Sequence, residues 1–412
     1  MLRDRRIVMG VCGGIAAYKA ADVVSKLQQA GALVDVILTH HAGDFVRALT
    51  FSTLSHRPVY EDLWESSGQA AARHIELAEA AEVLLVAPAT ADTIARLAHG
   101  MASDMLGAVA LATTAPLVVV PAMEQHMYEH AATQANLRVL VERGATIVPP
   151  EVGHLASGMI GTGRFPETPT ILAWVRAVLG RDGDLAGRRV VVTAGGTQEP
   201  IDPVRYVGNR SSGLMGYALA EEARDRGAEV VLISGPVALP PPAGLRVERV
   251  LTALEMRDAV VAAIAGADAL VMAAAVADYR VEHPATHKIK KGSAAENRDG
   301  SLALRLVRNP DILADVRQRS SGTGLIRVGF AAETDDLAMH AAAKLNGKGL
   351  HLLVANDISK VGSGFGTATN EVAIFHPDGR IEQLALLPKH DVAAAIWDRV
   401  VPLLRSQTAP VT

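Results

Sequence analysis

The chain has 412 residues, a formal net charge of −4 and one cysteine, Cys12. A chain of this length is too long for one hydrophobic core, so we expect two or three domains. The single cysteine excludes an intrachain disulfide framework and a cysteine-rich zinc site. The mildly acidic balance gives no general reason to expect a nucleic acid as partner.

No segment has the pattern of a membrane span or a secretion signal. The longest apolar run, residues 115–123, contains two prolines and falls well short of the ~18 residues that span a bilayer. The N-terminus passes from basic residues directly into an apolar strand, without a cleavable signal. We therefore expect a cytoplasmic protein with no membrane partner.

Two stretches of the chain begin in the same way. Residues 5–39 and 187–236 each contain an apolar strand, a Gly-Gly turn, an amphipathic helix and a second strand, and the latter stretch has an insertion after the glycines. Hydrophobic residues make up 49% of the chain and aromatic residues only 4%, which is typical of aliphatic cores in α/β proteins. Continuous apolar strands alternating with helices predict parallel sheets covered on both faces. We expect an α/β protein with two doubly wound, Rossmann-like domains.

The predicted domains follow one another along the chain. The first spans residues 1–180 and ends with a helix, and a polar, glycine-bearing linker occupies residues 181–187. The second domain spans residues 188–405, and its last thirty or so residues alternate apolar and polar side chains. Residues 406–412 read as a disordered tail.

In the first domain, candidate binding residues follow the predicted strands, because ligands of open α/β sheets bind at the carboxyl ends of the strands. Gly13 and Gly14 would let backbone N–H groups and a helix N-terminus approach a phosphate. The segment has neither GxGxxG nor a P-loop pattern, and a plain tight turn explains it equally well. Thr39, Thr90 and Thr93 could offer hydroxyls to the same anion, or each could be an ordinary helix N-cap.

His74 precedes an amphipathic segment that leads into a strand. Histidine is the side chain best suited to acid–base chemistry near neutral pH, so His74 is a catalytic candidate. A structural or solvent-exposed histidine is the alternative interpretation.

The second domain carries a longer polar constellation. Its Gly-Gly turn leads to Asn209, Arg210 and residues 211–213 directly before a helix, a good cradle for phosphate. Asp278 lies at a strand end, where a carboxylate could hold a magnesium ion between phosphate oxygens.

Lysines follow in the same domain. Lys288, Lys290 and Lys291 come shortly after Asp278, and Lys344 and Lys348 lie four residues apart on a predicted helix. Such scattered positive charge suits a triphosphate with magnesium, although a lysine run is often only a solvated face.

Several longer stretches occur in a fixed order over nearly the whole chain. They are GVCGGIAAYK, APATADTIARLAHG, PAMxxxM, TAGGTQEPIDPVRYVGNRSSGLMG, AAAVADYR, KIKK, NPDI, GFAAET and AND. Together they resemble the bifunctional phosphopantothenoylcysteine decarboxylase and phosphopantothenate-cysteine ligase of bacterial coenzyme A biosynthesis.

The resemblance implies that the N-terminal half is a flavodoxin-like flavoprotein domain that holds FMN. The matching residues are Gly13, Gly14, Ile15, Thr39, Pro88, Ala89, Thr90 and Ala91. The histidine that matches His74 serves the decarboxylase. In that family the flavin takes a hydride from the cysteinyl group, the resulting thioaldehyde loses carbon dioxide as an enethiolate, and the reduced flavin returns the electrons.

For the C-terminal half the resemblance implies a ligase that uses CTP and Mg2+. It activates the carboxylate of 4'-phosphopantothenate as an acyl-cytidylate, and the amine of cysteine displaces CMP. Asn209 matches the asparagine linked to this intermediate, and Asp278 matches the aspartate that contacts the magnesium and the nucleotide. The remaining residues that match nucleotide contacts are Ala274, Lys288, Asn309, Pro310, Asp311, Ile312, Phe330, Lys344 and Lys348.

The departures from the family pattern fall in the first half. Glu124 replaces the asparagine that holds the substrate carboxylate, and it would repel that carboxylate unless it is protonated or paired. Tyr128 replaces a tryptophan. In the glycine-rich flap at residues 154–165, Ser157 replaces the cysteine that gives a proton to the enethiolate, and a hydroxyl is a far poorer acid than a thiol. Cys12 sits beside the expected flavin phosphate and does not substitute for that cysteine.

These departures leave three hypotheses. In the first, the protein is bifunctional with a variant decarboxylase site, and His154 or His126 supplies the missing proton. In the second, an active ligase is fused to a flavin-binding module that has lost its chemistry. In the third, the protein is a non-enzymatic nucleotide-binding protein, which leaves Asn209, Asp278 and Lys288 unexplained. The resemblance also implies a homo-oligomer, a dodecamer built from trimeric flavoprotein contacts and dimeric ligase contacts.

Overall fold

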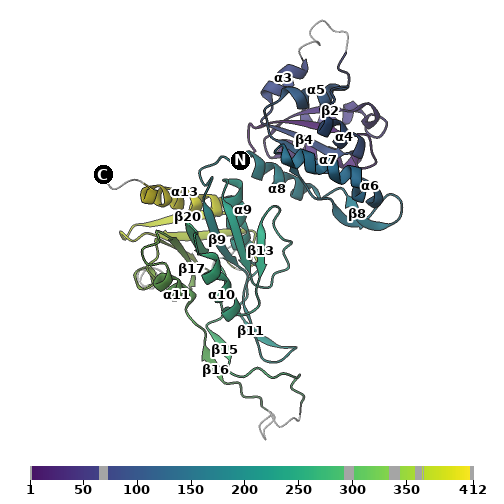
Figure 1. The fold of residues 1–412 in the computed structure, drawn as a ribbon. Helices are drawn as coiled ribbons and strands as arrows, with labels where there is room; N and C mark the ends of the chain where they lie inside the picture. Colours follow the sequence, from purple (N-terminus) through teal and green to yellow (C-terminus); the bar gives the residue numbers. More distant parts are fainter. Residues whose placement is uncertain are drawn as a thin grey trace. The chain divides into compact units, whose positions relative to one another are not determined.

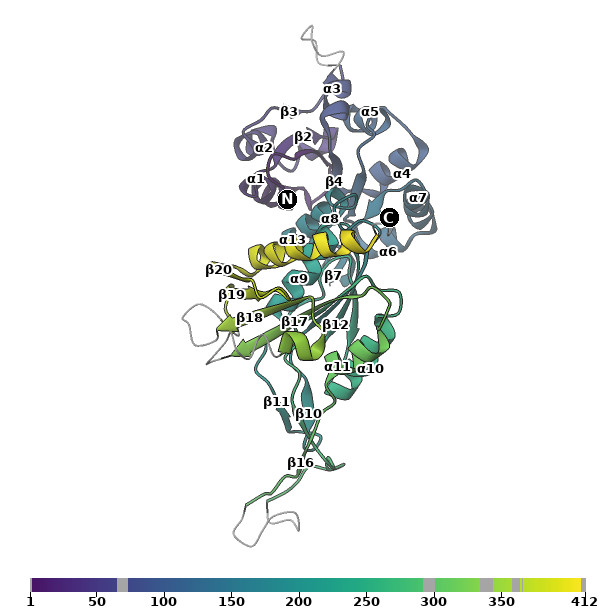
Figure 2. The same ribbon diagram turned by 90° about the vertical axis from the view of Figure 1, so that its left-hand side faces the viewer.

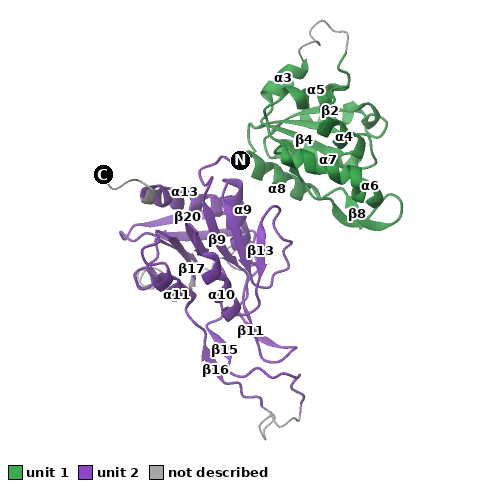
Figure 3. Cartoon of the chain, viewed as in Figure 1, with its two compact units in different colours: residues 1–180 green, residues 181–412 purple. Residues whose placement is uncertain are grey.

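The computed structural model describes residues 2–64, 73–291, 301–333, 344–357, 364 and 366–408. The chain is an α/β protein whose strands are flanked by helices (Figures 1 and 2). It divides into two compact units, Met1–Gly180 and Arg181–Thr412 (Figure 3). In the described ranges, no helix is long and apolar enough to cross a membrane.

The described part of unit 1 contains one parallel sheet and a separate antiparallel hairpin. The sheet strands are β1 (Arg6–Val11), β2 (Leu33–Leu38), β3 (Val59–Tyr60), β4 (Val83–Ala89), β5 (Leu117–Pro121) and β6 (Thr146–Ile147), and the hairpin strands are β7 (Glu151–His154) and β8 (Ile160–Arg164). The helices are α1 (Ala17–Gln29), the 3-10 turn η1 (His40–Ala42), α2 (Ala48–Ser55), α3 (Arg73–Ala80), α4 (Ala91–His99), α5 (Met105–Ala112), α6 (Gln125–Glu129), α7 (Ala131–Glu142) and α8 (Thr168–Leu179).

The strand order of unit 1 confirms the doubly wound prediction. The order is β3-β2-β1-β4-β5-β6, and every neighbouring pair is parallel. This is the Rossmann order, and without the two-residue edge strand β3 it becomes the flavodoxin-like order. The chain direction reverses between β1 and β4, so a ligand site is expected at the carboxyl ends of these two strands.

Apolar spacing explains the helices that cover the sheet of unit 1. Along α1 the buried residues include Ala17, Ala20, Val24 and Leu27, which recur every three or four residues and form one face. They pack with α2 and α8 on one side of the sheet, while α3, α4, α5 and α7 contribute to the core on the other side. All of β4 is buried between these layers, as expected of a central parallel strand.

Unit 2 contains a larger sheet and two small ribbons in its described part. The sheet strands are β9 (Arg189–Ala194), β12 (Glu229–Ser234), β13 (Arg246–Arg249), β14 (Ala269–Met272), β17 (Ile326–Glu333), β18 (Leu352–Asp357), β19 (Thr369–Phe375) and β20 (Ile381–Pro388). The ribbons pair β10 (Gln198–Pro200) with β11 (Tyr206–Gly208), and β15 (Tyr279–Val281) with β16 (Leu306–Arg308). The helices are α9 (Leu214–Asp225), α10 (Ala253–Ala263), α11 (Ile312–Arg319) and α13 (Lys389–Thr408).

The sheet of unit 2 repeats the doubly wound order and then departs from it. Its order is β13-β12-β9-β14-β17-β18-β19-β20, with the direction reversal between β9 and β14. The strands from β13 to β18 are parallel as predicted, but β19 and β20 are antiparallel, so the sheet is mixed. A short turn joins β19 to β20, which permits only antiparallel pairing. Helices α9 and α13 pack on one face of the sheet, and α10 and α11 pack on the other (Figure 2).

Two boundary predictions differ from the structure in detail. Leu185, inside the predicted linker 181–187, is fully buried in the core of unit 2. Helix α13 continues to Thr408, past the predicted start of a disordered tail at residue 406, and residues 409–412 lie outside the described ranges. Short polar sequences hide both features, because a single leucine or one extra helical turn gives almost no periodic signal.

Candidate functional site

A cavity of about 730 Å3 lies at the switch point of unit 1. Seven of the predicted site residues line it, namely Gly13, Gly14, Ile15, Thr90, Ala91, Glu124 and Ser157. The sequence analysis did not single out four other lining residues, Tyr18, Lys19, Met127 and Leu155. Tyr18 and Lys19 follow the Gly-Gly turn by only a few residues, so their place next to the predicted site was the available signal.

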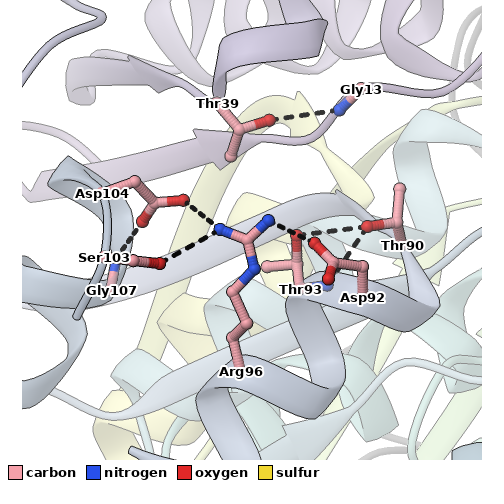
Figure 4. A network of polar contacts seen from close by, with 9 residues as sticks. All are labelled: Gly13, Thr39, Thr90, Asp92, Thr93, Arg96, Ser103, Asp104 and Gly107. Atoms are coloured by element: carbon pink, nitrogen blue, oxygen red, sulfur yellow. Dashed lines mark hydrogen bonds and ion pairs between the residues drawn. The ribbon is translucent and has the colours of Figure 1, made fainter. Parts of the chain in front are cut away.

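The Gly-Gly turn is held by the residue that ends the neighbouring strand. The backbone N–H of Gly13 donates to Oγ1 of Thr39 at 3.2 Å (Figure 4). A Cβ atom on Gly13 would lie 2.5 Å from Cβ of His41, so only glycine fits here. Thr39 is not among the lining residues of the cavity, and it acts on the site through Gly13.

Thr90 is a helix N-cap and also lines the cavity. Its Oγ1 accepts a hydrogen bond from the N–H of Thr93 at 3.3 Å and so caps α4, and it also donates to Oγ1 of Thr93 at 3.1 Å. Thr90 lines the cavity as well. Pro88 and Ala89 belong to the buried end of β4 and do not line the cavity, and Pro88 accepts a hydrogen bond from the N–H of Cys12 at 3.2 Å.

An ion-pair network lies behind this loop and connects α4 to α5. The guanidinium of Arg96 pairs with Asp92 one turn earlier and with Oδ2 of Asp104 at 3.0 Å (Figure 4). Oδ1 of Asp104 accepts from the N–H of Gly107 at 2.8 Å and caps α5. The network fixes the start of α4 against α5, and the Asp92–Arg96 spacing was its sequence signal.

Glu124 is paired, which settles how a carboxylate is accommodated at this position. It caps α6: Oε2 accepts from the N–H of His126 at 2.7 Å, and Oε1 lies 2.9 Å from Nδ1 of the same histidine. Partial desolvation opposes ionisation, but the hydrogen bonds from His126 prevail and lower the pKa of the Glu124 carboxyl group. Glu124 is therefore ionised at neutral pH, with His126 as its partner.

The glycine-rich flap is the β7–β8 hairpin. At its tip the N–H of Gly158 donates to the carbonyl of Leu155 at 2.9 Å, with Gly158 at a φ of +84°. Ser157 lies in this turn, is solvent-exposed and lines the cavity together with His154. Arg164 also lines the cavity, but its guanidinium pairs with Glu167 instead of remaining available to an anion.

The base of the flap is attached to the loop after β5. The N–H of Met123 donates to the carbonyl of Gly163 at 3.0 Å. A Cβ atom on Gly163, whose φ is +140°, would lie 2.1 Å from the carbonyl oxygen of Met123. The flap can approach this loop only because residue 163 is glycine.

Two further residues of unit 1, His74 and Cys12, are not among the residues that line the cavity. His74, near the start of α3, is not among the lining residues, although its Nδ1 is buried and has no hydrogen-bond partner in the described part of the chain. Cys12 is fully buried, and burial raises the pKa of its thiol to about 11. Cys12 is thus a protonated core residue at neutral pH.

A second cavity, of about 570 Å3, lies at the carboxyl end of β14 in unit 2. Eight predicted nucleotide residues line it, namely Ala274, Asp278, Asn309, Pro310, Asp311, Ile312, Phe330 and Lys348. Lys348 donates to Oδ2 of Asp311 at 3.2 Å, and Asp311 also caps α11. Lys344 lies one helical turn before Lys348 and is not among the lining residues.

Hydroxyl and amide side chains hold the wall of this cavity. Oγ1 of Thr193 accepts from the N–H of Ala274 at 3.1 Å, and Oγ1 of Thr197 accepts from the N–H of Ala277 at 2.9 Å. The side-chain amide of Asn309 donates to the carbonyl of Ala277 at 2.8 Å. The sequence analysis missed both threonines, which flank the second Gly-Gly turn.

Asn209 and Lys288 lie outside the lining of the second cavity. The side-chain amide of Asn209 donates to the carbonyl of Val276 at 3.0 Å, so Asn209 contacts the cavity wall from the neighbouring loop. Lys288 is solvent-exposed on a segment beyond β15. Among the described residues, no cluster of three or more His, Cys, Asp or Glu side chains could hold a metal ion. Asp278 would therefore need ligand oxygens to complete a cation site.

Two doubly wound units, each with a ligand-sized cavity at or beside its switch point, define an α/β protein of the class that binds nucleotides and related cofactors. The Flavoprotein family model matches residues 1–180, and the model of the DNA/pantothenate metabolism flavoprotein C-terminal domain matches residues 185–403. Each unit of the chain thus matches one family model.

Full-length relatives identify the family. The "Coenzyme A biosynthesis bifunctional protein CoaBC" of Bacillus subtilis is 43% identical over 406 residues, which cover 98% of this chain and 98% of that protein. The protein of the same name from Escherichia coli K12 is 44% identical over 97% of each chain. A solved structure of the C-terminal domain of such a protein is 36% identical, with a TM-score of 0.46, and covers 54% of this chain and 99% of that one. The chain belongs to the family of bifunctional coenzyme A biosynthesis proteins.

Proposed function

We propose that this protein carries out two consecutive steps of coenzyme A biosynthesis. Unit 2 joins 4'-phosphopantothenate to cysteine at the expense of CTP, and unit 1 decarboxylates the product to 4'-phosphopantetheine. One observation carries this proposal: each unit matches one of the two family models, and each holds a ligand-sized cavity lined by residues predicted for its ligand.

The cavity of unit 1 suits FMN. Gly13, Gly14, Ile15, Thr90 and Ala91 line it, and the start of α1 offers backbone N–H groups to a phosphate. Its volume of about 730 Å3 is in the range of small-molecule and cofactor sites. When bound, FMN supplies the chemistry of accepting a hydride from the cysteinyl group and returning it.

The protein's own groups have separate tasks in decarboxylation. Both oxygens of the Glu124 carboxylate are engaged at His126, one by the backbone N–H and one by the ring, which supports a structural role for Glu124 at the start of α6 rather than direct contact with the substrate carboxylate. His154 and Ser157 line the same cavity on the flap and can reach a bound substrate as proton donors. Nδ1 of His74 is buried without a hydrogen-bond partner among the described residues, which supports a functional role for this histidine.

The alternative is a flavin-binding half without decarboxylase activity. Two observations favour the active enzyme. Both oxygens of Glu124 are engaged by hydrogen bonds at His126, and the flap reaches the cavity with Ser157 in an ordered turn. A module released from catalysis has no physical need for either feature.

In unit 2 the second cavity suits a nucleoside triphosphate. Asp278 would hold Mg2+ together with phosphate oxygens of the nucleotide. Lys348 supplies positive charge inside the cavity, and Phe330 and Ala274 supply its apolar wall. Asn209 is hydrogen-bonded to Val276 at the cavity wall, which supports a role in orienting the activated carboxyl group for attack by the amine of cysteine.

One reaction mixture tests the proposal. The purified protein is incubated with 4'-phosphopantothenate, cysteine, CTP and Mg2+, and the products are identified by mass spectrometry. We expect 4'-phosphopantetheine and released carbon dioxide, with no product when CTP is omitted. Accumulation of 4'-phosphopantothenoylcysteine alone would establish the ligase without the decarboxylase, and the absence of both products would refute the proposal.

A flavin absorption spectrum of the purified protein tests the cofactor independently of turnover. Light scattering tests the oligomeric state, which we propose to be a homo-oligomer because His74 lies apart from the cavity of its own unit. A monomer that decarboxylates at full rate would contradict that part of the proposal.

A further inference from the structure

A two-stranded arm, formed by β15 and β16 and the described residues that follow β15, begins at the rim of the second cavity. Strand β15 begins directly after Asp278, and β16 returns directly before Asn309. The N–H of Asn309 donates to the carbonyl of Asp278 at 2.8 Å, and Tyr279 pairs with Arg308 in the ladder, so the arm is closed at its base. After β15, residues 282–291 continue away from the cavity and include Lys288 (Figure 1).

The β10–β11 ribbon supports this arm. The ribbon and the arm extend from the same end of the unit 2 sheet (Figures 1 and 2). At the tip of the ribbon, the carbonyl of Ile201 accepts a hydrogen bond from the N–H of Ala285 at 2.9 Å. The two segments are therefore joined away from the cavity as well as close to it.

Asp202 is the centre of the contact between them. Its side chain is fully buried, and Oδ1 accepts from the N–H groups of Val204 at 2.8 Å and Arg205 at 2.9 Å. Oδ2 accepts from Nε of Arg205 at 3.1 Å and from the N–H of Ile289 at 3.1 Å. Nη2 of Arg205 in turn donates to the carbonyl of Ile289 at 3.1 Å. Both backbone polar groups of Ile289 are thus held by one charge-paired unit.

Fixing the backbone of Ile289 also affects its two neighbours in the sequence, which are exposed lysines. Lys288 and Lys290 have solvent-exposed side chains on this segment. A buried carboxylate that binds an arginine and three backbone N–H groups is a rigid attachment point. Attaching the backbone between two lysines restricts where their ammonium groups can go before any anion arrives.

We propose that Asp202 is a positioning residue for the nucleotide substrate, which fixes Lys288 on the arm by holding Ile289. The inference rests on the proposed nucleotide-dependent ligase. Its physical basis is preorganisation: a lysine on a fixed backbone loses less conformational freedom when it binds a polyphosphate, so the complex is tighter. Asp202 itself does not contact the nucleotide.

Asp202→Asn separates the attachment from the local turn. The amide oxygen can still accept from Val204 and Arg205, while the amide nitrogen replaces the oxygen that serves Ile289 and the guanidinium. We expect the Kd of CTP with Mg2+, measured by calorimetric titration, to rise about tenfold. The KM for cysteine should change less than twofold. Asp258→Asn, the same substitution beside Arg257 at an exposed position on α10, is the matched control and should leave both values unchanged.

A double-mutant cycle shows whether the effect passes through Lys288. In a Lys288→Ala background, Asp202→Asn should cost little further affinity for CTP, because the lysine that it positions is gone. Equal effects of Asp202→Asn with and without Lys288, or equal losses for CTP and cysteine, would overturn the inference and leave Asp202 a purely structural residue.

A second variant covers the case in which Asp202→Asn does not fold. Ile289→Pro removes the N–H that Asp202 accepts, and it also fixes φ at residue 289 and restricts the backbone of Lys288. It should weaken CTP binding by a similar factor, whereas Ile289→Val keeps that N–H and should bind normally. Wild-type affinity in Ile289→Pro would contradict the inference. Failure of the wild-type protein itself to bind CTP with Mg2+ would instead refute the proposed ligase, so the two failures are distinguishable.

Discussion

The flap of unit 1 and the arm of unit 2 both border a cavity, but they are attached in different ways. The flap is held at its base by the backbone contact between Gly163 and Met123, and its tip around Ser157 is exposed. The arm is held at its base and again at Ile289 through the buried carboxylate of Asp202. A segment with an exposed tip suits covering a substrate that must enter and leave, whereas one attached at two separate places suits presenting fixed charge.

The largest effect that separates the two halves is expected at Asp278. Asp278→Ala should lower CTP-dependent ligation at least about 100-fold, because it removes the carboxylate proposed to hold the metal-bound nucleotide. Decarboxylation of supplied 4'-phosphopantothenoylcysteine should be unchanged. Asp258→Ala, at an exposed position on α10, is the control. Parallel loss of both activities in Asp278→Ala would show that the halves are not independent.

The flap is tested next, at its base. Gly163→Ala places a Cβ atom 2.1 Å from the carbonyl oxygen of Met123, so the hairpin must move. A displacement of about 1 Å should lower the decarboxylation rate roughly 10- to 100-fold and leave ligation intact. Gly158→Ala, at the tip, meets no atom within 4 Å and costs only about 1–2 kcal/mol of backbone strain. Equal losses from the two variants would contradict the base attachment.

A substitution at Ser157 is expected to raise the decarboxylation rate rather than lower it. Ser157→Cys introduces a stronger acid at an exposed position beside the cavity, so the decarboxylation rate should rise about tenfold if proton donation limits it. An unchanged rate would direct attention to the neighbouring histidines. In that case His154→Ala and His126→Ala should each be assayed, and full activity in both would eliminate histidine as the donor.

The smallest effect concerns the pH dependence of stability. The hydrogen bonds from Arg205 hold the pKa of the Asp202 carboxyl group well below its usual range. Its contribution to stability is therefore fully present above the ordinary carboxyl pKa of about 3.9 and is lost as the pH falls toward the depressed value. Asp202→Asn should lower the Tm by about 2–6 °C at neutral pH. The difference in Tm between the wild-type protein and Asp202→Asn should become smaller below about pH 4. A difference that grows in acid would contradict the stabilising role of the ionised Asp202 carboxylate.

The sequence predicted most features that follow the rule of strand ends. Gly13, Thr90 and Asp278 lie next to cavities because the carboxyl ends of neighbouring parallel strands meet at one edge of the sheet. Asn309, which follows a strand of an antiparallel ribbon, was predicted only from the family resemblance. The same rule could not place His74, which lies on a helix whose surroundings depend on tertiary packing.

Contacts between segments that are distant in the sequence could not be predicted from the sequence. Asp202 and Ile289 are 87 residues apart, and no local pattern predicts that a carboxylate in one ribbon binds the backbone of another. The pairing of Glu124 with His126 depends on a helix cap two residues long, and the antiparallel β19–β20 addition depends on one short turn. Each requires the folded backbone as its starting point.

Leu185 determines where this protein can be divided. It is fully buried in the second core, and its N–H donates to the carbonyl of Arg226 at 3.0 Å. A separately produced C-terminal half that begins at Arg188 would lack this side chain and leave a void worth about 1.5–3 kcal/mol of lost burial. A cut between Gly180 and Leu185 keeps the second core intact. Leu185, although it lies in the predicted linker, therefore decides whether the ligase half can be prepared alone.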